Sequence, residues 1–240
     1  MTLRLLIVAA AVCGLASATA LTVSLDTSGL IGHPAGPFSL DFQLTDGSGT
    51  GDANNTFTLT DFLFDSGGAS GLPSLTGGAT GDTSTGVTLT DSSFLSEFTQ
   101  AFVPGASLSF TLQFTTNVDG GGTPDEFAFE ILDSTGTALP STSFATLGFD
   151  SQLVMDIDSS NPTIQLFATD NTISPAGGGD PISLDAPVTS AGPGGPPNPT
   201  PEPGTASLIG AGIALTCAWK NRALLRVLSW ESFRSGAPRH

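Results

Sequence analysis

The stretch Phe38-Ser-Leu-Asp-Phe-Gln-Leu44 decides the fold of this chain. Apolar and polar residues alternate along it, so that Phe38, Leu40, Phe42 and Leu44 share one face. Alternation with a period of two is typical of a β-strand that buries one face against a core and turns the other to water. The stretch therefore predicts a half-buried strand.

The same alternation recurs along much of the chain. It predicts further strands at Leu21–Leu25, Val87–Leu89, Leu108–Phe114, Phe127–Leu132, Leu153–Ile157 and Thr163–Ala168. The segments between them are rich in Gly, Asp, Asn and Ser, as tight turns require. About eight to ten short strands in roughly 150 residues predict an all-β fold, a single antiparallel β-sandwich that is jelly-roll-like.

Three local features modify this pattern. The 57–64 segment changes phase after Leu59, which predicts a β-bulge at Thr60-Asp61. The apolar residues of 94–102 have helical spacing and predict a short helix there. The tripeptide Leu-Thr-Asp recurs at 44–46, 59–61 and 89–91 without a fixed period, and we interpret it as strand ends that run into Asp-capped turns.

The charge distribution excludes several classes of function. The formal charge is −16, and no Lys or Arg lies between Leu5 and Trp219, whereas twenty carboxylates lie between Asp26 and Asp185. Nucleic acid is excluded as a partner, because its phosphates require cations. A lysine Schiff base is also excluded in this region, because the region contains no lysine. The two cysteines, Cys13 and Cys217, lie in apolar terminal segments, so the region has no thiol nucleophile.

Residues 1–20 are expected to be a signal peptide. Arg4 precedes an uncharged run from Leu5 to Leu15, and the small residues up to Ala20 follow it. The Ala18-x-Ala20 pattern predicts cleavage by signal peptidase after Ala20, and cleavage after Ala18 is the second choice.

The C-terminal region is expected to contain a transmembrane helix. Thr205–Trp219 carries no charge, and Lys220, Arg222 and Arg226 follow it. This basic cluster predicts a cytoplasmic end, with residues 227–240 as a cytoplasmic tail. Pro201, Glu202 and Pro203 stand immediately before the apolar segment.

The tripeptide Pro201-Glu202-Pro203, a short apolar helix and a basic cluster together resemble the PEP-CTERM sorting signal of exported bacterial proteins, here residues 201–226. The resemblance implies recognition by an exosortase, a membrane peptidase-transpeptidase, with processing near the tripeptide. It also implies a transient anchor in the inner membrane before processing, and then a location at the cell surface or in the extracellular matrix.

The central region also resembles an uncharacterised family of PEP-CTERM exported proteins. The resemblance lies in Asp26-Thr-Ser-Gly-Leu30, Phe38–Leu44, Leu108-Ser-Phe110 and Pro124–Asp133. It implies a localisation and a fold but no known activity. We place the domain at 21–173 and a linker at 174–200, because nine of the seventeen prolines lie between 174 and 203.

The chain offers few groups for catalysis. His33 lies in Gly32-His-Pro-Ala-Gly36, and no serine has a nucleophile elbow around it. A zinc enzyme generally needs two or three His ligands, whereas the domain has one His and no Cys. We therefore expect no enzyme and no catalytic residue, although a glycosidase built on paired carboxylates stays formally open.

Calcium is the cofactor that these residues favour, since hard oxygen ligands are abundant. Three loops qualify, at 46–55, 117–126 and 150–158 with the adjoining Asn161. In the second loop, four side chains flank a flexible Gly-Gly-Gly run and are the candidate metal ligands: Asn117, Asp119, Asp125 and Glu126. Solvated turns, with acids that serve solubility, are the favoured alternative.

The leading hypothesis is an exported, non-enzymatic cell-surface or matrix component, associated with exopolysaccharide and biofilm through the PEP-CTERM resemblance. The second hypothesis is a calcium-dependent carbohydrate-binding or adhesion module, and the third is a glycoside hydrolase-like enzyme. The expected partners are signal peptidase, exosortase, the membrane and an extracellular polysaccharide.

Overall fold

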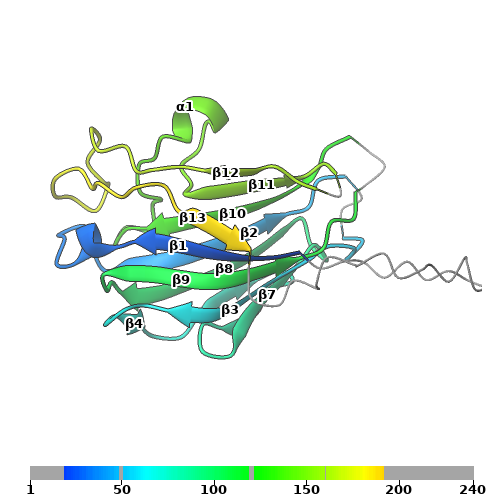
Figure 1. Ribbon diagram of the computed structural model, residues 1–240, viewed down its shortest axis with the longest axis horizontal. Coiled ribbons are helices and arrows are strands. Elements are labelled where there is room, and N and C mark those ends of the chain that lie inside the picture. Colours follow the sequence, from blue (N-terminus) through cyan, green and yellow to red (C-terminus); the bar gives the residue numbers. More distant parts are fainter. Residues whose placement is uncertain (1–18, 49–50, 119–121, 160, 192–240) are drawn as a thin grey trace, which may run out of the picture. The chain divides into compact units, whose positions relative to one another are not determined.

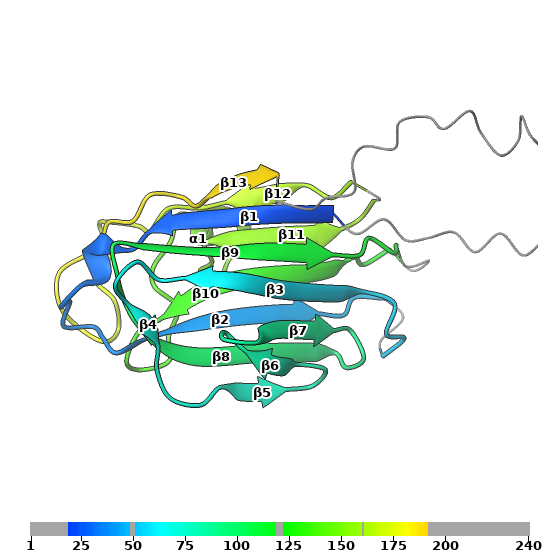
Figure 2. The ribbon, with the colours of Figure 1, turned by 60° about the horizontal axis from the view of Figure 1, so that its bottom comes forward.

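The computed structural model describes residues 19–48, 51–118, 122–159 and 161–191. These residues form two antiparallel β-sheets with almost no helix (Figures 1 and 2). The expected all-β, antiparallel class is confirmed. The expected signal sequence up to Ala18 and the expected C-terminal helix lie outside the described residues. None of the helices in the described part has the length and apolar character needed to cross a membrane.

The chain crosses between the two sheets several times, and some successive strands stay in one sheet. The first sheet has the order β13-β1-β9-β3-β7-β6, and the second has the order β12-β11-β10-β2-β8-β4, with β5 also paired to β8. The strands of the first sheet are β1 (Thr19–Asp26), β3 (Thr56–Leu63), β6 (Thr80–Asp82), β7 (Gly86–Thr90), β9 (Ser107–Phe114) and β13 (Val188–Ala191). Those of the second are β2 (Phe38–Thr45), β4 (Gly68–Ala69), β5 (Ser74–Thr76), β8 (Leu95–Val103), β10 (Asp125–Leu132), β11 (Leu153–Ile157) and β12 (Ile164–Leu166). The helical pieces are η1 (Ser28–Leu30) and α1 (Phe144–Leu147).

Strand β2 lies at the centre of the second sheet, between β10 and β8. Phe42 is directly opposite Phe129 on one side and Phe98 on the other, so three rings share the inner face. All three side chains are completely buried. The alternation in the 38–44 stretch therefore supplies the inner face of a central strand.

The two sheets face one another across one hydrophobic core. The ring of Phe42 in the second sheet packs edge-on against Phe110 of the first, with centroids 5.2 Å apart. The rings of Phe57 in the first sheet and Phe127 in the second stack at 4.6 Å, nearly parallel. Aromatic pairs of this kind add to the free energy gained by burying their apolar area.

The bulge predicted in the 57–64 segment is confirmed. The register of β3 against β9 shifts between Thr60 and Leu63, and Asp61 has a positive φ of 55°. The shift allows Phe62 to pack against the core after the break in alternation.

The helix predicted at 94–102 is wrong, because Leu95–Val103 is strand β8. Its side chains alternate between partly buried and buried up to Phe102, and Phe98 and Phe102 point into the core. A spacing of four fits both one helical turn and one face of a strand, so the phenylalanines alone did not discriminate between them. Phe94 precedes the strand and is exposed.

The predicted boundary between domain and linker at 173–174 is also corrected. Strand β13 pairs with β1, and Ile182 and Leu184 belong to the hydrophobic core. The Leu184 N–H donates to Thr169 Oγ1 at 2.7 Å, and Thr169 Oγ1 donates to the Ile182 carbonyl, also at 2.7 Å. The folded unit therefore includes residues 174–191.

We predict that Ile182→Ala lowers the free energy of unfolding by about 2–5 kcal/mol, because it removes buried methyl groups from a packed site. Ile173→Ala is the matched control, since Ile173 is 53% exposed whereas Ile182 is 4% exposed. It should change stability by about 0.5 kcal/mol or less. Urea unfolding of both variants measures the difference, and equal effects would contradict the corrected boundary.

Candidate functional site

Four polar side chains extend the core at one end of the two sheets. Asp46, Asn55, Asp91 and Asp125, here called the loop-end cluster, are all buried. Each stands two positions from a core residue of its own strand, namely Leu44, Phe57, Leu89 and Phe127. Residues two apart in an extended chain point to the same side. The alternation that builds the core therefore also turns these four side chains inward.

Asn55 connects the loops of this end. Its backbone N–H donates to Asp91 Oδ2 at 2.8 Å, and its side-chain amide donates to Asp125 Oδ2 and to the Asn117 carbonyl, each at 2.7 Å. Its Oδ1 accepts from the Asn117 N–H at 2.9 Å and from the Thr115 hydroxyl at 3.2 Å. The hydrogen-bonding capacity of Asn55 is thus used to hold three separate chain segments together.

Asp125 joins the 46–48 turn to this arrangement. Its Oδ1 accepts from the Gly47 N–H at 2.9 Å. A Cβ atom at position 47 would lie 2.3 Å from the Pro124 carbonyl oxygen, so only glycine fits this close approach. The Ser48 N–H donates to the Thr123 carbonyl at 3.0 Å, which closes the contact between the two loops.

Two carboxylate oxygens of the cluster have no hydrogen-bond donor. Asp46 Oδ2 accepts from the Gly51 N–H, but Asp46 Oδ1 is buried without a partner. Asp91 Oδ2 accepts from Asn55, but Asp91 Oδ1 is buried without a partner. Burial, together with the nearby charges of Asp125 and Asp52, raises the pKa of Asp91 to about 7.

The predicted metal ligands are only partly brought together. Asp125 lies in the cluster. The Asn117 N–H donates to Asn55, which in turn donates to Asp125. Glu126 is the next residue of β10, so its side chain lies on the opposite face of the sheet from Asp125. It is directly opposite Asp156. Asp119 lies outside the described residues. Asp125 and Glu126 therefore do not share a site.

The described parts of the 46–55 and 117–126 loops, two of the three predicted calcium loops, are in contact with one another. Asp91, which lay in neither, joins them. The Leu-Thr-Asp tripeptides at 44–46 and 89–91 carried the relevant signal, because in each the Asp is the next inward position after a buried Leu. Among the described residues, no group of three or more His, Cys, Asp or Glu side chains is arranged to hold a metal ion.

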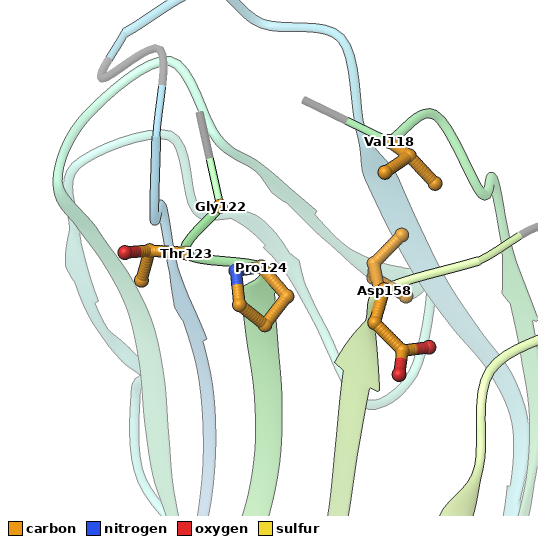
Figure 3. Close-up of a pocket in the computed structure, with 6 residues that line it drawn as sticks. Val118, Gly122, Thr123, Pro124 and Asp158 are labelled. Carbon is orange, nitrogen blue, oxygen red and sulfur yellow. The ribbon is translucent and has the colours of Figure 1, made fainter. Parts of the chain in front are cut away.

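A small hollow lies beside the cluster, between the 122–124 segment and the end of β11 (Figure 3). Val118 and Pro124 flank it, and the Asp158 carboxylate is on the side away from Val118. Its volume is about 100 Å³. Sites for small molecules generally occupy about 300–1,000 Å³, so this hollow is too small to enclose a sugar ring.

A larger hollow of about 330 Å³ lies beside α1. Its lining includes Phe144, Ile173, Asp150 and Asp170. Asp150 Oδ1 accepts from the Ser141 N–H at 2.6 Å, and Asp170 Oδ1 accepts from the Thr172 N–H and hydroxyl. Both carboxylates therefore stabilise local turns.

His33 has a structural role in its loop. Its Nδ1 accepts from the Ala35 N–H at 3.2 Å, and its Nε2 lies 3.0 Å from the Asp180 carbonyl oxygen. A neutral imidazole with the proton on Nε2 satisfies both contacts.

The outer face of the second sheet carries a group of carboxylates without cations. Asp41 on β2 is directly opposite Glu130 on β10, and Glu97 projects from β8 on the same face. Burial, together with the charge of Asp41, raises the pKa of Glu130 to about 8. Burial also raises the pKa of Asp41 to about 6, against hydrogen bonds from Gln43 and Thr99 that lower it. This face is therefore partly protonated near neutral pH.

This arrangement predicts a fall in stability as the pH rises. A carboxyl group with a folded-state pKa above its unfolded value stabilises the fold at low pH, and this contribution is lost as the pH rises through the folded-state value. In EDTA, the unfolding midpoint should decrease between pH 5 and pH 8.5. Glu130→Gln, which is always neutral, should raise the midpoint at pH 8.5 and change it little at pH 5.

Asp180→Asn is the control, because it removes the same charge from an exposed position. Thermal unfolding of the three proteins at both pH values measures the effect. A wild-type midpoint that stays constant or rises with pH would contradict the raised pKa values.

Comparison with models of protein families, with curated proteins and with solved structures gave no match. The chemistry of the described residues and the sequence of the two ends are therefore the basis for assigning a function.

Proposed function

We propose that this protein is an exported cell-surface or extracellular-matrix component, sorted by an exosortase and associated with exopolysaccharide. The observation that carries the proposal is the ordered C-terminal signal: Pro201-Glu202-Pro203, then the uncharged Thr205–Trp219 segment, then Lys220, Arg222 and Arg226. The N-terminal signal sequence supports export. The proposal requires no enzymatic activity. It includes a folded part that is a β-sandwich of jelly-roll type.

The position of β1 bears on the cleavage site. Thr19 and Ala20 are paired with Phe114 and Gln113 of β9, and the Ala20 side chain is buried. Cleavage after Ala20 would remove two paired residues from β1, whereas cleavage after Ala18 would leave the strand intact. We therefore favour Ala18 as the last residue removed.

The carboxylates of the folded unit support a non-enzymatic role. Asp26, Asp82 and Asp170 each accept hydrogen bonds from residues two positions further along the chain. Hydrogen bonds from Ser28 hold the pKa of Asp26 below its usual range, as those from Ser84 and Thr172 do for the pKa values of Asp82 and Asp170. These groups stabilise turns on a surface of high negative charge, which suits a soluble component of a hydrated matrix.

A second candidate function is a calcium-dependent adhesion or carbohydrate-binding module. The observation that favours it is the loop-end cluster, where buried carboxylates from separate loops meet without a cationic side chain.

We predict that replacing Pro201-Glu202-Pro203 by three alanines blocks C-terminal processing in a bacterium that has an exosortase. The wild-type chain should lose its C-terminal segment and reach the cell surface or matrix, whereas the variant should keep that segment and stay in the inner-membrane fraction. Mass spectrometry of the C-terminal peptides and immunoblots of the fractions measure both results.

The matched control replaces Pro196, Pro197 and Pro199 by alanine, which changes three prolines and leaves the signal intact. It should be processed like the wild type. Normal processing of the signal variant, or of the wild type in a strain without exosortase, would overturn the sorting proposal.

A further inference from the structure

The loop-end cluster places two acidic groups in contact where neither has a counter-charge. Asp91 and Asp125 are both buried, and their carboxyl groups are within hydrogen-bonding range of one another. Asp52, on the adjacent exposed turn, adds a third negative charge to their surroundings. Like charges that are removed from water cannot both persist without compensation.

Neighbouring N–H groups compensate only part of this charge. Three of the four carboxylate oxygens of Asp91 and Asp125 accept a hydrogen bond, from Asn55 or from Gly47. The fourth, Asp91 Oδ1, is buried and has no donor. A buried acceptor without a partner normally indicates a missing ligand such as water, a proton or an ion.

The described part of the chain contains no Lys or Arg that could supply the missing charge. Water can occupy the position next to Asp91 Oδ1, but only a proton or an ion from solution can compensate the charge there. A proton serves at low pH, whereas at neutral pH and above an ion becomes the better partner, since a divalent cation can contact several oxygens at once.

We propose that Asp91 and Asp125 bind one calcium ion, which joins the chain segments around Gly47, Asp91 and Asp125 at this end of the protein. Both groups are hard oxygen ligands, and the other oxygen of the cluster that is buried without a donor, Asp46 Oδ1, belongs to a carboxylate as well. Calcium takes six to eight oxygen ligands in irregular geometry and accepts carbonyl oxygens and water beside a few carboxylates. Two facing carboxylates are therefore a sufficient anionic core, although they are fewer than a cage of three acidic side chains.

Magnesium suits this position less well. It requires nearly ideal octahedral geometry and gives up its waters reluctantly. The segments that carry Asp91 and Asp125 are held in place by hydrogen bonds from Asn55, which leaves little freedom to build an octahedron. The proposal identifies metal ligands for the second candidate function, the calcium-dependent module, and rests on that function only for the biological use of the site. Calcium can bind here whether or not the protein is sorted by an exosortase.

The test uses the purified full chain in mild detergent at pH 7.5, stripped with EDTA and dialysed at constant ionic strength. Calcium chloride and, separately, magnesium chloride are the probes, in calorimetric titration and in thermal unfolding. We expect one calcium ion per chain, and a rise in the unfolding midpoint of about 5–10 °C at a hundredfold excess over the dissociation constant. Magnesium should have a clearly smaller effect.

Asp91→Asn is the decisive variant. It keeps the size of the side chain and an oxygen that can accept from Asn55, but it removes the charge. It should weaken calcium binding by at least about a hundredfold. In EDTA it should be at least as stable as the wild type, because it no longer buries an uncompensated charge, and this result separates lost binding from lost folding.

Asp156→Asn is the matched control, on the outer face of the second sheet beside Glu126. It should bind calcium like the wild type. If Asp91→Asn proves unstable, the amide resonances of Gly47 and Asn55 in the wild-type protein provide an independent readout, and both should shift on addition of calcium. Absence of calcium binding, equal effects of the two ions in all variants, or loss of binding in Asp156→Asn alone would overturn the proposal.

Discussion

The constraint that governs this protein is the burial of carboxylates in a folded unit without lysine or arginine. Twenty acidic side chains lie between Asp26 and Asp185, and the only basic side chain among the described residues is His33. Salt bridges are therefore not available as a means of compensation. Each acidic group must be exposed, hydrogen-bonded by the backbone, protonated or bound to an ion. Asp26 and Asp82 accept hydrogen bonds from the backbone, and Glu130 is protonated near neutral pH. For Asp91 we propose a bound ion.

The hydrophobic core determines where these acids lie. Phenylalanines of both sheets interlock between the layers, as in the contact of Phe42 with Phe110, and they fix which side of each strand faces inward. A residue that stands an even number of positions from such a phenylalanine on the same strand also faces the interior, even when it is polar. Asp91 and Asp125 are buried for this reason, because Asp91 stands two positions after the core residue Leu89 and Asp125 two positions before the core residue Phe127. The loop-end cluster is thus a continuation of the core by polar groups.

The sequence predicted most of the central strands because alternation is a local property. It failed for β8, where a spacing of four fits two structures, and for residues 174–191, where proline content indicated a linker although β13 pairs with β1 far away in the chain. The candidate metal ligands show the same limit of local patterns. Neighbours in sequence were grouped, yet Glu126 faces away from Asp125, while Asp91 arrives from a strand 34 positions earlier in the numbering. Local sequence patterns give no information about contacts between segments that are distant in the chain.

The most direct test of this account is an NMR titration of the side-chain carboxyl carbons in EDTA. The account predicts apparent pKa values of about 6 for Asp41, about 7 for Asp91 and about 8 for Glu130. Asp26, Asp82 and Asp170 should titrate below the usual range of aspartate. If all six groups titrate together near the values of unfolded peptides, the carboxylates are not held as described and the central claim is wrong.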